Sequence, residues 1–348
     1  MFERLVTWLT IGGFHFWVIM LGILFGILAA ASFGFNSASA RRGVIGGTPF
    51  QAMAISMPLG LIMFAVLAGI AGQWFEISRL DLSAIGFLAA GGFAHFVWGR
   101  YFNVRSLAAV GSNLAAPVQQ FQLLLALTLA VLFLGETLTP LNILGIVLVI
   151  SAPIYILSRR AKEKAAQNPI EKPTEPSGFT PRMAEGYICA FLAGTGFGSS
   201  TVLIKAGLSD ASLSLIGGVV SYVAATSVVF LLLLVPRMRF EVLCTTRQSA
   251  KWFVYSGLGV SISQLFRFLA LGLAPVTVVQ PLGSLSVIFR MIFGYFINRE
   301  NEAFQGYVIV GILLSFLGAL SLSLSVGVVT DYLALPTWLQ DIVAWHWP

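Results

Sequence analysis

The chain has 348 residues, of which 57% are hydrophobic and only 10% are charged. Typical soluble domains carry about 25% charged residues, so this composition, with a mean hydropathy of +0.90, excludes a soluble globular protein and indicates lipid as the solvent. Backbone inside lipid must satisfy its own hydrogen bonds, and the apolar runs are too long for barrel strands. The sequence therefore predicts an all-α polytopic membrane protein. The net charge of +6 comes mostly from basic residues beside apolar runs, so it indicates topology rather than nucleic-acid binding.

Apolar windows of about 20 residues predict ten transmembrane helices. They cover residues 14–35, 51–73, 84–104, 107–135, 139–158, 184–206, 212–236, 252–272, 275–298 and 304–326. A polar segment at 159–183, rich in lysine and proline, separates the first five helices (14–158) from the second five (184–326) and is predicted to be an exposed linker. The short Trp-rich tail at 327–348 is predicted to lie on the membrane interface.

The two halves repeat at a constant offset of 164 positions. The offset relates Gly34 to Gly198, Arg41 to Lys205, Gly43 to Gly207, Phe102 to Phe266, Pro117 to Pro281 and Glu136 to Glu300. Beyond Glu300 the offset becomes 166, as for Gly145 and Gly311. Because five helices per half is an odd number, the second half must enter from the opposite face, which predicts two inverted five-helix repeats.

The distribution of lysine and arginine predicts the orientation. Most basic residues near the ends of the predicted helices fall on the same side as the linker, and only Arg4, Arg79 and Lys205 fall on the other. The positive-inside rule therefore places the linker in the cytoplasm and both termini outside. We expect a bacterial inner (plasma) membrane.

Two segments carry a resemblance to a known family. Leu132 to Thr139 reads Leu-Phe-Leu-Gly-Glu-Thr-Leu-Thr and is followed by Gly145, and the run from Ala274 to Leu282 stands at the equivalent place in the second half. These segments resemble the drug/metabolite transporter superfamily, EamA type, over both halves. The second copy departs from the pattern, because no Leu-Gly precedes Glu300. The resemblance implies a secondary carrier or facilitator with a central cavity between the halves, for substrates that range from amino acids and sugars to nucleotide derivatives, lipids and drugs.

Charged residues inside the predicted helices are basic rather than acidic. No Asp or Glu lies well inside a predicted helix, which argues against a proton-coupled carrier of cationic drugs. Arg100, Arg267 and Arg290 do lie inside, although each such arginine costs about 2.5–3.5 kcal/mol at a helix centre. Arg100 with Asn103, and Gln264 with Arg267, form two repeat-related pairs in swapped order, three residues apart on one helix face. They predict a site for a carboxylate or phosphate. Alternatively, these arginines reach lipid headgroups or cap neighbouring helices.

Further polar residues follow the same symmetry. The amides of Asn113, Gln120 and Gln280 are costly to bury and are predicted to line the cavity. Pro117 and Pro281 are predicted to break equivalent helices near the middle of the membrane, or to kink them without consequence. His95 is either a proton relay or a hydrogen-bonded packing residue.

These features predict a secondary transporter for a small anionic or zwitterionic metabolite, such as an amino acid or organic acid, working by alternating access in the export direction. The alternative is a flippase for a lipid-linked anion. No ATP-binding motif, catalytic cluster or metal-ligand spacing occurs in the sequence, so we expect neither an enzyme nor a cofactor. Expected partners are a small-molecule substrate and membrane lipid. Small residues permit close helix approach, so the fifth and tenth helices are predicted to form a scaffold or a homodimer surface; their spaced glycines are Gly145, Gly306, Gly311 and Gly318.

Overall fold

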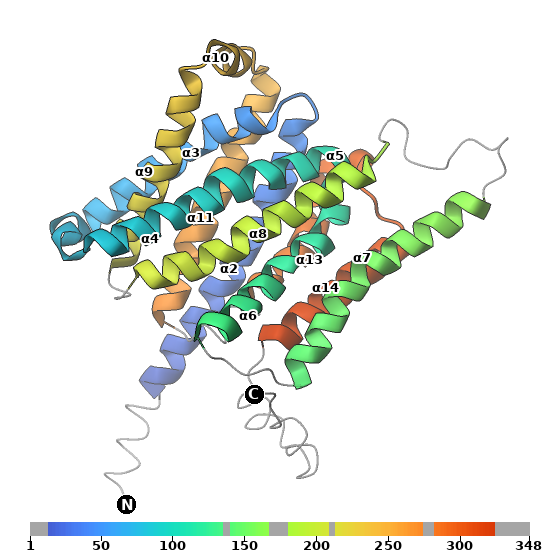
Figure 1. Cartoon of the computed structure of the whole chain (residues 1–348), viewed down its shortest axis with the longest axis horizontal. Helices are drawn as coiled ribbons and strands as arrows, with labels where there is room; N and C mark the ends of the chain where they lie inside the picture. The colour runs from blue at the N-terminus through green and yellow to red at the C-terminus, as the bar shows by residue number, and fades with distance from the viewer. Residues whose placement is uncertain (1–12, 135–139, 167–179, 209–212, 274–281, 324–348) are drawn as a thin grey trace, which may run out of the picture.

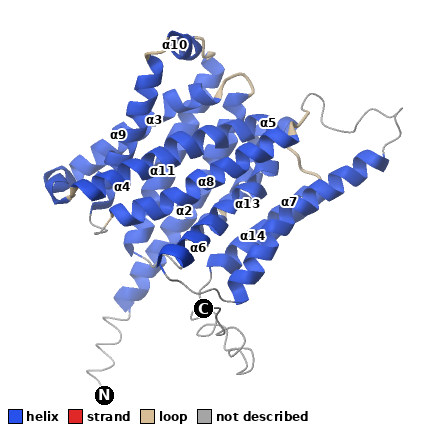
Figure 2. Cartoon of the chain, viewed as in Figure 1, coloured by secondary structure: helices blue, strands red, loops and turns tan. Residues whose placement is uncertain are grey.

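A computed structural model describes residues 13–134, 140–166, 180–208, 213–273 and 282–323 (Figure 1). Every regular element in these residues is a helix (Figure 2). In chain order the elements are α2 (Gly13–Val44), α3 (Pro49–Ile70), η2 (Gln73–Arg79), α4 (Leu82–Gly92), η3 (Phe93–Gly99), α5 (Arg100–Gln119), α6 (Phe121–Leu134), α7 (Pro140–Ala166), α8 (Met183–Gly207), α9 (Ser214–Leu233), α10 (Pro236–Leu243), α11 (Arg247–Leu273), α13 (Ser286–Asn298), η5 (Arg299–Asn301) and α14 (Gly306–Ser323).

Local sequence signals account for several helix starts. Thr48 accepts a hydrogen bond from the Gln51 backbone N–H, and the Gln51 side chain accepts one from the Thr48 N–H at 2.9 Å, which is a reciprocal cap for α3. Asp81 caps α4 by accepting from the Ala84 N–H at 2.7 Å. These caps satisfy amide groups that the first helical turn leaves without partners.

The third and fourth predicted helices meet at a sharp corner. The elements α4, η3 and α5 follow one another without a loop, and the helical geometry fails at Gly111, where φ is 81° and ψ is 171°. Glycine suits this left-handed φ because it has no Cβ. The predicted boundary at 104–107 is therefore wrong by several residues. Asn103 and Ser106, which lie at or beside the predicted boundary, are buried helical residues.

Six helices in the described part of the chain are long and apolar enough to cross a membrane, and a seventh apolar helix, Gly306–Ser321, is shorter. One of the six, Leu82–Leu125, has 44 residues. A crossing needs about 20 residues, so the corner at Gly111 divides this run in two. With α11 and α13 the elements would amount to ten crossings, and the ten-helix count stays a prediction.

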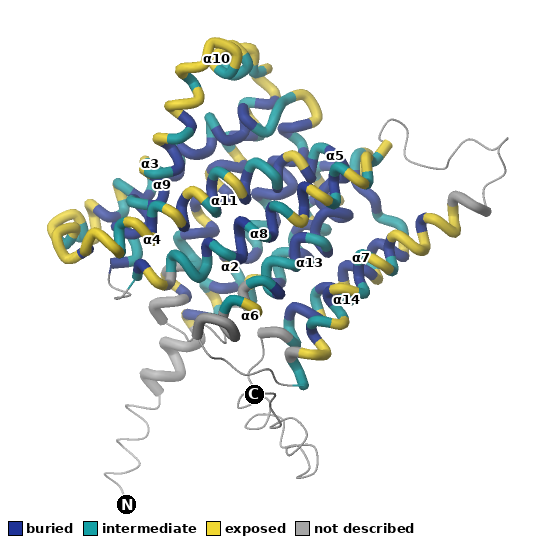
Figure 3. The backbone as a smooth tube through the Cα atoms, in the orientation of Figure 1, coloured by how far each residue is buried: buried dark blue, intermediate teal, exposed yellow. Residues whose placement is uncertain are grey.

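The first helix of each repeat packs against helices of the other repeat. The first helix of the first half, α2, packs against α11 and α13, whereas its repeat counterpart α8 packs against α5 and α6 (Figure 1). Likewise α3 packs against α9. Buried residues gather in the centre of the bundle around these helices, and α10 is exposed (Figure 3). The two halves are therefore interleaved, as an inverted repeat requires.

The fifth and tenth predicted helices, α7 and α14, lie side by side at one edge of the bundle (Figure 1). A Cβ on Gly311 would come within 2.5 Å of Ile156, and one on Gly318 within 2.8 Å of the Val149 backbone nitrogen. The glycines at 311 and 318 therefore pack α14 against α7 inside one chain. An exposed stripe on α7, which includes Val147 and Ile154, faces outward. The homodimer stays a prediction that these two glycines do not support.

Candidate functional site

A polar cavity of about 110 Å³ lies between the two halves. The first half contributes α2, η3 and α6, and the second contributes α8, α11 and residues 283–286. The polar side chains among its lining residues are His95, Gln120, Gln122, Thr201, Ser263, Gln264, Arg267, Ser284 and Ser286. The other lining residues are Leu123, the aromatic Phe33 and Phe197, and small residues. Four residues predicted to form the site, His95, Gln120, Gln264 and Arg267, thus meet around one space.

Arg267 is the cation of this cavity. It lies on α11, is half-buried, and donates from Nη2 to the Thr201 hydroxyl at 3.4 Å, a long contact. Among the described residues this is its one hydrogen bond, and no acidic side chain lines the cavity. A guanidinium has five donors in a planar fork that matches a carboxylate or phosphate. Arg267 therefore keeps donor capacity that an anion entering the cavity can use.

Gln120 lies where the fourth helix is interrupted. The α5 helix ends at Gln119 and α6 begins at Phe121. Gln120 lies between them, three residues after Pro117, whose missing N–H weakens the preceding turn. The Gln120 side chain is 3% exposed and lines the cavity, yet its Nε2 has no hydrogen-bond partner. A buried amide donor without a partner costs about 1–3 kcal/mol. The predicted position of Gln120 at the cavity wall is therefore found in the structure, whereas its role toward a ligand stays a prediction.

His95 connects the two halves from an unusual stretch of helix. It belongs to η3, a π-helical segment, and π-helical turns occur frequently at functional sites. Its Nδ1 lies 3.1 Å from the Ser200 hydroxyl, and its Nε2 lies 3.0 Å from Gln264 Nε2. With the Gln264 amide in this orientation, Gln264 Nε2 donates to His95 Nε2. The imidazole proton then lies on His95 Nδ1, which donates to the Ser200 hydroxyl. Both ring nitrogens are engaged, which favours the packing alternative over the proton relay.

Arg100 does not face the cavity. It is 3% exposed and donates from Nε to Ser56 at 3.0 Å, from Nη1 to Asn36 at 3.2 Å and from Nη2 to Ser256 at 3.0 Å. These partners lie on α3, α2 and α11. With Asn103, Arg100 borders only a separate void of about 10 Å³, which is at the limit for one water. The ligand-binding role of Arg100 stays a prediction, and these three contacts favour a structural role instead.

Asn103 and Arg290 meet at Gln119 rather than at the cavity. The Gln119 amide donates to Asn103 Oδ1 at 2.7 Å and accepts from Arg290 Nη1. The Arg290 guanidinium also lies 5.6 Å from the centre of the Phe33 ring, within cation–π range. Asn113 lies farther away and donates to the Ala303 carbonyl at 2.9 Å. Gln280 and Pro281 lie outside the described residues.

One buried acidic residue was not predicted. Glu302, in the loop before α14, has a side chain with 0% exposure and lies 4.0 Å from Arg41. Burial raises the pKa of its carboxyl, and the Arg41 guanidinium opposes that shift. The offset of 166 that relates Gly145 to Gly311 also relates Glu136 to Glu302, so that offset was the signal that could have found it.

Comparisons with known proteins agree with this architecture. Fourteen chains of known structure match the chain. One of them, known from a crystal structure, is 16% identical with a TM-score of 0.57, and the alignment covers 87% of this chain and 96% of that one, which shows a shared fold. No curated protein gives a significant match. A family model, the EamA-like transporter family, matches residues 20–158 and 184–324 and confirms the resemblance seen in both halves. The chain belongs to the EamA-like transporter family.

Proposed function

We propose that this membrane transporter moves a small anionic or zwitterionic metabolite, such as an organic acid or an amino acid, in the export direction. The observation that carries the proposal is the Arg267 guanidinium at the wall of the cavity between the halves, where its one described hydrogen bond is the 3.4 Å contact to Thr201. Charges withdrawn from solvent are normally paired, and Arg267 is half-buried. A substrate carboxylate would supply the missing partner, and the Gln120 amide would supply a second hydrogen bond.

The size of the cavity supports a small substrate. Sites for drug-sized ligands measure about 300–1,000 Å³, whereas this cavity measures about 110 Å³. That volume suits a molecule with a few heavy atoms and disfavours the alternative of a lipid-linked anion. Transport is driven by a gradient or is passive, because the sequence lacks the GxxxxGK[ST] motif of an ATPase.

A thermal-shift screen of the detergent-purified full chain tests the substrate class. The probes are succinate, alanine and putrescine, which are an anion, a zwitterion and a cation of comparable size. We expect succinate or alanine to raise the Tm, since a ligand at 100 times its Kd stabilises by about 2.7 kcal/mol. Arg267→Gln should abolish the shift, and Gln120→Leu should reduce it.

The control is Arg79→Gln, which removes an exposed arginine that pairs with Glu76 at 3.3 Å. It should leave the ligand-induced shift unchanged. A shift with putrescine alone, or a shift with succinate that persists in Arg267→Gln, would contradict the proposal. Efflux of the stabilising compound from loaded liposomes then tests the direction.

A further inference from the structure

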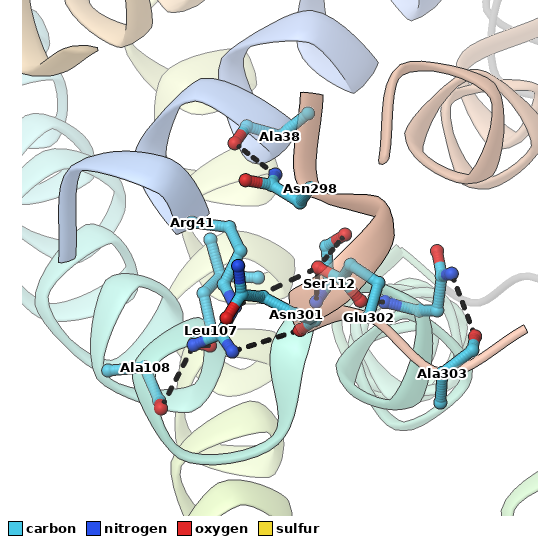
Figure 4. Close-up of polar contacts among 10 residues, drawn as sticks. Ala38, Arg41, Leu107, Ala108, Ser112, Asn298, Asn301, Glu302 and Ala303 are labelled. Carbon is cyan, nitrogen blue, oxygen red and sulfur yellow. Dashed lines mark hydrogen bonds and ion pairs between the residues drawn. The ribbon is translucent and has the colours of Figure 1, made fainter. Parts of the chain in front are cut away.

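A second buried polar cluster joins three chain segments (Figure 4). The segments are the end of α2 with Arg41, the corner at residues 107–113, and the loop between α13 and α14 with Asn301 and Glu302. Arg41 donates from Nη1 to the carbonyls of Leu107 at 2.9 Å and Ala108 at 3.1 Å, and from Nη2 to Asn301 O at 3.0 Å.

Glu302 completes this cluster from the other side of the corner. One carboxylate oxygen accepts from the Ser112 N–H at 2.6 Å and the Ser112 hydroxyl at 2.7 Å, and the other accepts from the Asn113 N–H at 3.0 Å. A Cβ on Gly111 would lie 2.7 Å from Glu302 Oε2. The positive φ of this glycine thus brings the corner directly against the carboxylate.

The chemistry of the cluster follows from the interruption at Gly111. The helix before it leaves carbonyls without partners and the helix after it leaves N–H groups without partners. Arg41 binds the carbonyls and Glu302 binds the N–H groups, in the arrangement that the helix dipoles favour. The two charges also lie 4.0 Å apart. Two side chains therefore hold three segments, and the loss of either one releases contacts in all three.

The cluster lies on one side of the cavity along α2. The cavity is lined by Gly26 to Phe33, and Arg41 follows Phe33 by eight residues, or about 12 Å at 1.5 Å per residue. Between them lies the buried layer around Asn36 and Arg100. The Arg182 N–H donates to the Ala109 carbonyl at 2.9 Å, so the end of the linker meets the same corner. The cluster therefore lies at the face of the bundle that carries the linker.

We propose that the Arg41–Glu302 cluster is a latch that closes the linker side of the transport pathway and opens during the transport cycle. A buried ion pair often stabilises the folded state no better than well-packed apolar side chains do. Stability of the fold therefore does not by itself explain this cluster. Its contacts join the ends of segments rather than the faces of helices, so they can part without unpacking a helix. The inference rests on the proposed transport function but not on the identity of the substrate.

Cysteine accessibility in membrane vesicles tests the latch. The two native cysteines, Cys189 and Cys244, are replaced by alanine and serine, and Ser39→Cys is added as a reporter. Ser39 is fully buried and lies between Asn36 and Arg41 on α2. A membrane-impermeant maleimide is applied to each face in turn, and an epitope tag in the linker identifies the linker side.

We expect slow labelling of Ser39→Cys from the linker side in the otherwise unaltered chain. Glu302→Gln should raise that rate at least tenfold, and Ser112→Ala, which removes one donor, should raise it less. The rate from the opposite face should stay unchanged. The matched control is Arg105→Gln, which breaks the Arg105–Glu185 ion pair, an exposed one near the same corner, and should have no effect.

Two results would overturn the latch. One is an unchanged labelling rate in Glu302→Gln and Ser112→Ala proteins that melt and elute like the parent. The other is an equal increase from both faces, as a general loosening of the helix bundle would give. If Glu302→Gln does not fold, the labelling rate of Ser39→Cys in the Ser112→Ala protein decides whether the latch exists. No substrate is used, so failure here leaves the Arg267 test untouched, and failure of the Arg267 test leaves this one interpretable.

Discussion

Arg100→Ala is expected to lower the stability of the folded protein by about 2–4 kcal/mol. The substitution leaves Ser56, Asn36 and Ser256 without the guanidinium that bridges them. It also leaves a cavity at a buried position where α2, α3, α5 and α11 meet. Relief from the cost of burying the guanidinium offsets part of this loss. The Tm of the detergent-purified chain should fall by about 5 °C or more.

The matched control is Arg267→Ala. Arg267 has one long described contact, to Thr201, so its removal should change the Tm of the ligand-free protein far less than removal of Arg100. A larger effect at Arg267 than at Arg100 would show that the two roles are reversed. Comparison of the two variants thus distinguishes an arginine that joins helices from one that faces the cavity.

Gly92→Ala is expected to destabilise the packing of the third predicted helix on α9. The added Cβ would lie 2.3 Å from the Ser221 carbonyl oxygen and 2.6 Å from the Ser221 Cα. These are backbone atoms, which cannot rotate away, so we expect a cost at the upper end of the range of about 1–3 kcal/mol for overpacking. Thermal melting and the yield of monodisperse protein after size-exclusion chromatography measure the effect.

Gly86→Ala is the control for this substitution. Gly86 lies on the same helix, α4, and a Cβ there would meet nothing within 4 Å. Alanine has the higher helix propensity by about 1 kcal/mol, so this variant should melt at or above the parent's Tm. A Gly92→Ala protein as stable as Gly86→Ala would mean that the helices can separate there at little cost.

Much of the fold was predictable from hydropathy, but the corner at Gly111 was not. A hydropathy window registers Arg100 to Ser106 as polar and places a helix end there. The window cannot detect that Asn103 and Gln119 hydrogen-bond to each other at 2.7 Å inside the bundle. The helix continues through this segment because its polar groups find partners on neighbouring helices rather than in water.

The candidate site was predictable in residue type but not in its division of roles. The repeat places Arg100 and Gln264 at equivalent positions, which suggested two equivalent ligand groups. In the structure Asn36 and Ser56 already hold Arg100, whereas Arg267 faces the cavity. Such pairing depends on which residues happen to lie across from each arginine. Glu302 was missed for a related reason, because it lies in a loop and becomes buried only through tertiary contacts.

The position of Arg41 has a consequence for how the protein is made. Arg41 and Asn301 hydrogen-bond although they are 260 residues apart in the chain, and the other large neighbours of α2, the helices α11 and α13, also come late. The first helix therefore enters the bilayer long before its partners are synthesised. The hydrogen bond from Arg41 to Asn301 can form only after most of the polypeptide has been synthesised. A chain that ends at the linker would keep the contacts of Arg41 with Leu107 and Ala108 but would lack those of α2 with Asn301, α11 and α13, so the full set of contacts around α2 forms only once the second half is present.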